Sequence, residues 1–286
     1  MIRRINKKIK TPEKQSQMGI QLETPKFNEQ LLRRQIILDR LIRMVAFTGI
    51  LGAFFWFTLF STTILPVSNV IMIVLLMMGW FAINSINART GRELGQVSSV
   101  IDQDPERVEK WIALALARRP LVRWVRLMIY HRLAMVRHRE RNFAEAAAIS
   151  RIVLGYPLGP AEGSRAHLLL LLTESSLEIH DIQTAYSSLS RLYSMPVSLT
   201  EALQRLSLQI RYELLTGNYD SAISNLDEKL EMVELLPAPQ CGVTHQLLAI
   251  AANRCGNHDL AEWLQKRANL LCKPEWLQAY DNVSPQ

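Results

Sequence analysis

The stretch GNHDLA at residues 256–261 decides the fold, because variants of it occur at three earlier places in the chain. The earlier copies are RNFAEA at 141–146, HDIQTA at 180–185 and GNYDSA at 217–222. Their final alanines are 39, 37 and 39 residues apart. Repeats of this length are typical of arrays of helical hairpins, in which each unit buries its apolar face against the next. The sequence therefore predicts an all-α repeat domain.

Each copy has the chemistry of a turn between two packed helices. A small or polar pair ends one helix, an aromatic or apolar residue starts packing at the turn, and an alanine lets the next helix lie close. We assign these turn and packing roles to Phe143, Ala146, Ala185, Tyr219, Ala222, His258, Ala261 and Ala268.

Helix signals continue on both sides of the repeats, and no alternating strand pattern interrupts them. Asp104-Pro105-Glu106 is an N-cap followed by a proline and an acid in the first turn, and Ser198 with Glu201 has capping-box spacing. We expect a repeat domain over 104–281, with 105–118 as its first helix and 274–281 as a terminal cap.

Between about 120 and 272 the chain resembles the tetratricopeptide repeat (TPR) family. Gly256, Asn257, Ala261 and Ala268 match that family's turn and second-helix alanines, whereas Lys229 stands where the third copy should have its later alanine. The period also exceeds the roughly 34 residues of the family. The resemblance implies a TPR-like α-solenoid whose concave surface binds a peptide or a partner helix, with a generic α-solenoid as the alternative.

The positive charge of the chain is confined to its first 43 residues. This segment carries 11 basic and 4 acidic side chains, whereas residues 44–286 carry 22 of each. Because the remainder is neutral, we expect no nucleic acid partner. Residues 1–26 have the composition of a basic flexible tail, and 27–42 have the apolar spacing of an amphipathic interfacial helix.

Residues 44–88 contain no charged side chain, a gap of 45 positions. Two membrane-spanning helices with a tight turn need about 45 residues. Pro66 interrupts the apolar run near its middle, so we predict a transmembrane hairpin over 43–88, with helices at about 43–64 and 69–87. The alternatives are a buried helical hairpin of a soluble core, a signal peptide and a mitochondrial transit peptide.

Arginines on both sides of this hairpin predict its orientation. Positive residues flanking a span remain on the cytoplasmic side, and both flanks carry them while the connecting loop has none. We therefore expect an integral membrane protein with both termini cytoplasmic, in the inner or plasma membrane if the source is bacterial. Arg33, Arg34 and Arg40 are candidates for contact with anionic lipid headgroups.

The region 118–141 is rich in arginine and nearly lacks acids. Arg119, Arg123, Arg126 and Arg137 fall roughly on one side of a helix there, which makes them candidates for contact with lipid headgroups or an acidic peptide. RNA is a third candidate, but the neutrality of the domain as a whole argues against it. A solvated face with ion pairs to Glu106, Glu109 and Glu145 is the structural alternative.

Motifs of catalysis and of metal or cofactor binding are absent from the sequence. GxSxG, GxxxxGK[ST] and HExxH do not occur, the six histidines are scattered, and the three cysteines are widely spaced. We expect no enzyme, cofactor or metal, and reduced thiols. The leading hypothesis is a membrane-anchored adaptor or scaffold whose cytosolic repeats bind a protein or peptide. The alternatives are an accessory subunit of a larger membrane complex, with the transmembrane hairpin as the main interface, and an enzyme with dispersed site residues.

Overall fold

The computed structural model describes residues 105–117 and 122–278, together with separate helical residues between Gln30 and Trp56 and between Val74 and Ser85. No strand occurs among these residues, so the all-α prediction is confirmed for them. None of the described helices is both long enough and apolar enough to cross a membrane. The tail 1–26 and most positions of the predicted interfacial helix and transmembrane hairpin lie outside the described residues.

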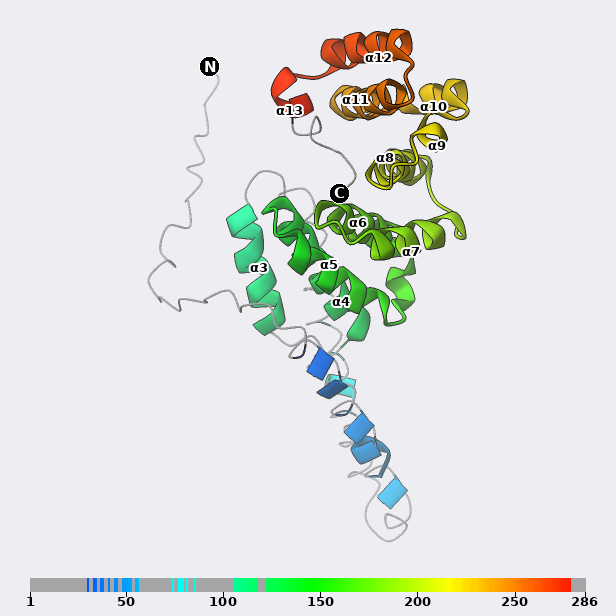
Figure 1. Ribbon diagram of the computed structural model, residues 1–286. Helices are drawn as coiled ribbons and strands as arrows, with labels where there is room; N and C mark the ends of the chain where they lie inside the picture. The colour runs from blue at the N-terminus through cyan, green and yellow to red at the C-terminus, as the bar shows by residue number, and fades with distance from the viewer. Residues whose placement is uncertain are drawn as a thin grey trace, which may run out of the picture.

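The helices form a curved row of hairpins (Figure 1). Consecutive helices pack as pairs, α4 with α5, α6 with α7, and α11 with α12, while α8 is followed by two short helices, α9 and α10. The bounds are α3 Pro105–Ala117, α4 Arg123–Arg139, α5 Phe143–Leu154, η2 Gly159–Ser164, α6 Arg165–Glu178, α7 Ile182–Tyr193, α8 Leu199–Leu215, α9 Tyr219–Ile223, α10 Leu226–Val233, α11 Ala238–Arg254, α12 His258–Leu271 and α13 Pro274–Gln278.

All four copies of the repeated phrase form the same turn. Its first residue has a left-handed backbone, with φ of 60° at Arg141, 58° at His180, 76° at Gly217 and 78° at Gly256. The next N–H reaches the carbonyl five residues back, with N···O distances of 2.8–2.9 Å at Asn142, Asp181, Asn218 and Asn257. A left-handed residue followed by a backbone hydrogen bond to the carbonyl five residues back is a common way to end a helix. Glycine occupies the left-handed position in the last two turns only.

Side-chain caps then start the second helix of three hairpins. The side chains of Asn142, Asp181 and Asn257 each accept a hydrogen bond from the backbone N–H three residues later. The final alanine of each repeated phrase follows within the first turn of that helix. Ala146, Ala185 and Ala222 are fully buried, as is Ala268, whereas Ala261 is half-buried. Phe143 and Tyr219 are half-buried and His258 is exposed.

The third hairpin differs because its second helix is broken. The break falls at Ser224 and Asn225, and Asn225 has a φ of 49°. The ammonium of Lys229 donates to the carbonyls of Ser221 at 2.6 Å and Ala222 at 2.9 Å, both in α9. These carbonyls lie at the end of α9, where the N–H and the hydroxyl of Ser224 also donate to the carbonyl of Ser221. Lys229 therefore replaces the expected alanine because it caps a helix that stops early.

Two main apolar clusters hold the row together. One joins α4, α5, α6 and α7 and includes Leu127, Ile149 and Leu169, and the other joins α8 to α12 and includes Ile210, Leu248 and Leu264. A smaller cluster packs α3 on the outer side of α4. At the other end α13 turns back beside α11 (Figure 1). The first helices of the four hairpins, α4, α6, α8 and α11, line one shared face.

Candidate binding groove

A groove of about 610 Å³ runs along the face formed by the first helices of the four hairpins. Each of α4, α6, α8 and α11 supplies side chains to it, and α13 supplies one more. The lining residues are Met135, His138, Arg139, Arg141, Phe143, His167, Leu170, Leu171, Glu174, Glu178, Gln204, Ser207, Leu208, Leu236, Pro239, Gln240, Val243 and Trp276.

Helical spacing explains why each helix reaches the groove more than once. On α6, Leu170, Glu174 and Glu178 are four residues apart, and on α8, Gln204 and Ser207 are three apart. Residues at these spacings lie on one face of a helix. The groove is therefore a continuous surface built from every repeat, and both apolar and polar side chains line it.

Both carboxylates of the groove have side-chain partners on a neighbouring helix. His138 lies 3.3 Å from Glu174 through Nε2 and 3.1 Å from the Ser175 hydroxyl through Nδ1. Burial acts to raise the pKa of Glu174, but the hydrogen bond with His138 and the positive charges of Arg211 and Arg139 outweigh it and hold that pKa below its ordinary value. Glu178 accepts a hydrogen bond of 2.8 Å from Arg211 on α8.

Two histidines lie together between α4 and α6. The Nε2 atom of His131 is 2.9 Å from Nδ1 of His167, which lines the groove. Burial lowers the pKa of His131 to about 3, with the neighbouring His167 and Arg132 adding to the effect. Burial also lowers the pKa of His167. Both rings are therefore neutral near pH 7, which favours a packing role for this pair.

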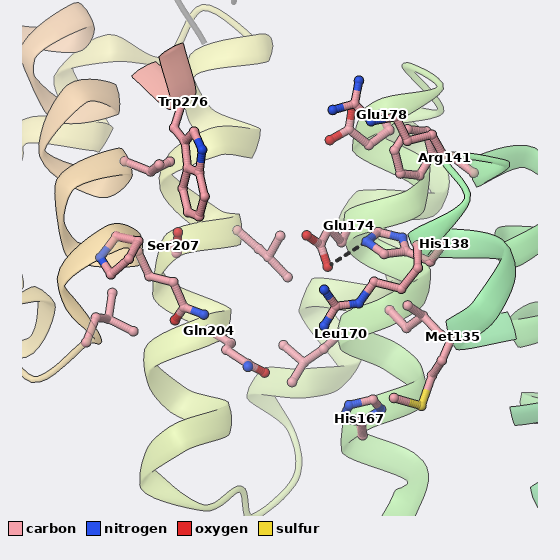
Figure 2. Close-up of a pocket in the computed structure, with 18 residues that line it drawn as sticks. Met135, His138, Arg141, His167, Leu170, Glu174, Glu178, Gln204, Ser207 and Trp276 are labelled. Atoms are coloured by element: carbon pink, nitrogen blue, oxygen red, sulfur yellow. Dashed lines mark ion pairs between the residues drawn. The ribbon is translucent and has the colours of Figure 1, made fainter. Parts of the chain in front are cut away.

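The wall opposite α4 is apolar, and buried contacts of α13 hold its aromatic side chain in place. Figure 2 shows Trp276 on one side of the groove, with Arg141 and Glu178 on the other. Trp276 is 55% exposed, whereas the adjacent Leu277 is 3% exposed and packs on Ala268 and Cys272. The buried leucine holds α13 in place, so the indole ring presents a positioned apolar surface to the groove.

Most of the predicted arginine contacts do not lie in this groove. Arg137 makes ion pairs with Glu109, Glu140 and Glu145 at 2.9, 2.6 and 3.2 Å. It therefore links α3, α4 and α5, as the structural alternative anticipated for two of these acids.

The other predicted arginines lie in three kinds of place. Arg123 stacks over the ring of Tyr156 at 5.1 Å, and Arg126 is half-buried beside Tyr130. Arg33 and Arg34 are exposed helical residues. Arg40 and Arg119 lie outside the described residues. Of the predicted arginines that the structure describes, none lines the groove.

Several groove residues were not singled out from the sequence, including Gln204, Ser207, Gln240 and Trp276. Superposing the four repeats by their turn residues would align the first helices, and the exposed positions at spacings of three and four would then have marked this face. Trp276 carries no such signal, because it comes from the short helix after the last repeat.

Within the part of the chain that the structure describes, no three His, Cys, Asp or Glu side chains gather in a way that would hold a metal ion. Cys241, Cys255 and Cys272 are free thiols. Comparisons of the chain with protein-family models, with curated proteins and with solved structures give no match.

Proposed function

We propose that this chain is a membrane-anchored adaptor whose TPR-like repeats bind an extended segment of a partner protein at the membrane surface. The observation that carries the proposal is the groove, because the first helix of every hairpin contributes to it. A concave surface of this kind suits an extended peptide, which contacts several repeats at once. Fold likeness alone assigns no ligand, so the groove's own chemistry must do so.

The side chains of the groove favour binding over catalysis. His138 and Glu174 pair with each other, and His167 is bonded to His131. Gln204, Ser207 and Gln240 supply amide and hydroxyl groups that match the backbone of an extended peptide. We therefore propose that the protein is not an enzyme.

The membrane anchor rests on the uncharged stretch 44–88 and on the described residues within it. Phe55, Trp56 and Phe81 are 66–70% exposed, and Met78 is 64% exposed. Contiguous exposed apolar side chains mark a membrane or protein interaction surface. These residues support the transmembrane hairpin, and equally support the alternative in which the hairpin is the main interface of a larger complex; the proposal of two cytoplasmic termini rests on the flanking arginines alone.

Site-specific photo-crosslinking in membranes separates these functions. A photoreactive residue replaces Gln240 in the groove, Gln183 on α7 outside the groove, or Met78 in the predicted hairpin. The adaptor function predicts a discrete adduct from position 240 and none from 183. If adducts form from position 78 alone, the accessory-subunit function is correct and the adaptor proposal fails.

A groove-filling variant provides the second readout. Gln240 is exposed and lines the groove, so Gln240→Trp narrows the groove without disturbing the core. The matched change Gln183→Trp adds the same ring to another exposed site. The proposal expects the adduct from a second groove position, Gln204, to disappear in Gln240→Trp and to persist in Gln183→Trp.

A further inference from the structure

Arg141 occupies a backbone position that ordinarily belongs to glycine. Its φ of 60° lies in the left-handed region, and the equivalent residues of the last two turns are Gly217 and Gly256. A side chain at such a position is sterically disfavoured, because its Cβ approaches the following carbonyl. Residues held in sparsely populated backbone regions concentrate at binding sites. Because His180 shares this conformation (φ 58°) without lining the groove, what distinguishes Arg141 is the place of its side chain.

The side chain of Arg141 lines the groove and is not used to stabilise the turn. It is exposed, and it forms no hydrogen bond or ion pair with another residue in the described part of the chain. The two acidic groups nearby are already paired, Glu174 with His138 and Glu178 with Arg211. Arg141 thus places an uncompensated guanidinium on one wall of the groove.

The opposite wall offers apolar contact at a fixed place. Trp276 faces Arg141 across the groove in Figure 2, and Pro239 and Val243 continue the apolar surface along α11. Between the two walls, the amides of Gln204 and Gln240 form no side-chain hydrogen bond with other described residues. They remain able to pair with a peptide backbone.

We propose that the groove selects an acidic peptide segment, in which an Asp or Glu side chain pairs with Arg141 and an aromatic or branched aliphatic residue packs on Trp276. This inference rests on the proposed peptide-binding function. A guanidinium presents paired N–H donors that match both oxygens of a carboxylate, which gives direction as well as charge. A peptide suits the groove better than a lipid headgroup. A phosphate could pair with Arg141, but it would leave the apolar wall and the two amides without contacts.

The substitution Arg141→Gly tests this assignment, because stability and binding should change in opposite directions. Glycine removes the steric conflict, so the thermal midpoint should rise by about 2–4 °C. The loss of the guanidinium should weaken the binding of an acidic peptide by about tenfold. The matched control is His180→Gly, which relieves the same conformation (φ 58°) at a residue that does not line the groove. It should raise the midpoint and leave binding unchanged.

The probes are short peptides selected from a random display library on the full-length chain in mild detergent. The selected peptides should be enriched in Asp or Glu next to an aromatic or branched aliphatic residue. Each is then compared with its Asn or Gln analogue by fluorescence anisotropy. The native chain should prefer the acidic peptide by about tenfold, and Arg141→Gly should bind both peptides equally. Trp276→Ala should weaken both peptides, whereas Trp263→Ala, which alters a half-exposed ring on α12 outside the groove, should weaken neither.

Several results would overturn the inference. Selected peptides without Asp or Glu would do so. An unchanged preference for acidic peptides in Arg141→Gly would also do so; if Gln240→Trp still abolishes binding, the groove remains the peptide site and only the role of Arg141 is wrong. Binding that Gln240→Trp does not affect would instead remove the proposed function. If phosphatidylserine vesicles, and no peptide, bind in an Arg141-dependent manner, the partner is a lipid surface. If peptides bind only after residues 279–286 are removed, the native occupant of the groove is the C-terminal segment of the chain itself.

Discussion

The Nε2 atom of His131 lies 2.9 Å from Nδ1 of His167, so one imidazole donates a hydrogen bond to the other between α4 and α6. This bond needs at least one ring to be neutral. Burial lowers the pKa of His131 to about 3 and also lowers that of His167. The pair therefore joins the first two hairpins with both rings neutral near pH 7, and protonation of both rings would break the bond.

The first prediction is that acid destabilises the domain through His131. In the unfolded chain this histidine takes up a proton as the pH falls through about 6.5, whereas the folded chain resists until about pH 3. The free energy of unfolding should thus be highest above pH 6.5 and fall by up to about 1.4 kcal/mol per pH unit below it. His131→Gln, which cannot be protonated, should flatten this slope.

Thermal unfolding by circular dichroism at about pH 7.5 and about pH 5 measures the difference. His258→Gln is the control, since His258 is exposed and lies outside this pair. Equal pH slopes for the native chain and His131→Gln would show that the histidine pair does not govern acid stability.

The second prediction concerns Arg137, whose three ion pairs join α3, α4 and α5. Its side chain is 12% exposed, and those of Glu109 and Glu145 are 19% and 14% exposed. Removing the cation leaves both carboxylates largely desolvated and without a positive partner, although Glu145 still accepts a hydrogen bond from the amide of Asn142. Arg137→Met should therefore lower the free energy of unfolding by about 2–4 kcal/mol.

Arg151 provides the comparison. Its side chain is 52% exposed and pairs with Asp181, so Arg151→Met should cost less than about 1 kcal/mol. Vesicle flotation with anionic lipid completes the test, because the sequence makes Arg137 a candidate for lipid contact. Unchanged stability together with lost vesicle binding in Arg137→Met would favour the lipid contact over the structural role.

The sequence identified the hairpins because their signals are local. A left-handed residue, a polar cap and an alanine occur within six consecutive positions, and the backbone bonds of each turn are formed by residues five apart. These short-range requirements appear directly as a repeated phrase. Their spacing therefore located all four turns without any knowledge of how the hairpins pack.

Interactions between distant parts of the chain were not predictable in the same way. Helical spacing groups Arg137 with Arg123 and Arg126, but it does not reveal that Glu109 on another helix pairs with Arg137. The groove likewise combines residues as far apart as Met135 and Trp276. Such sites depend on the curvature of the row and on where α13 turns back, and neither has a signal within one repeat.

The third prediction concerns Lys229, which caps the broken helix of the third hairpin. Its side chain is 13% exposed, and its ammonium donates to two carbonyls of α9. Lys229→Met keeps the length of the side chain but removes the ammonium from both carbonyls and from Glu213, which lies 4.0 Å from it, so the free energy of unfolding should fall by about 1–3 kcal/mol. Lys266→Met removes a 72% exposed ammonium paired with Glu262 and should change stability by less than about 0.5 kcal/mol. Similar losses in both variants, measured by urea unfolding, would contradict the capping role.

The fourth prediction concerns Gly242 on α11. Among the described glycines, it is the one where an added Cβ would come closest to a neighbouring residue. A Cβ added there would lie 2.7 Å from the Cβ of Cys272 and 3.2 Å from the carbonyl oxygen of Ala268. Alanine is a better helix former than glycine by about 1 kcal/mol, but the backbone of α12 would have to move. Gly242→Ala should therefore lower the free energy of unfolding by about 1–3 kcal/mol.

The control and a rescue distinguish this clash from a general effect of the substitution. Gly163 has open space around its Cβ position, so Gly163→Ala should change stability by less than about 0.5 kcal/mol. Cys272→Gly removes the contacting Cβ, so in that background Gly242→Ala should cost less than it does in the native chain. Urea unfolding of the four combinations gives the coupling. Additive losses would mean that the two helices separate freely at this contact, and that the last hairpin is not held by the close approach of its backbones.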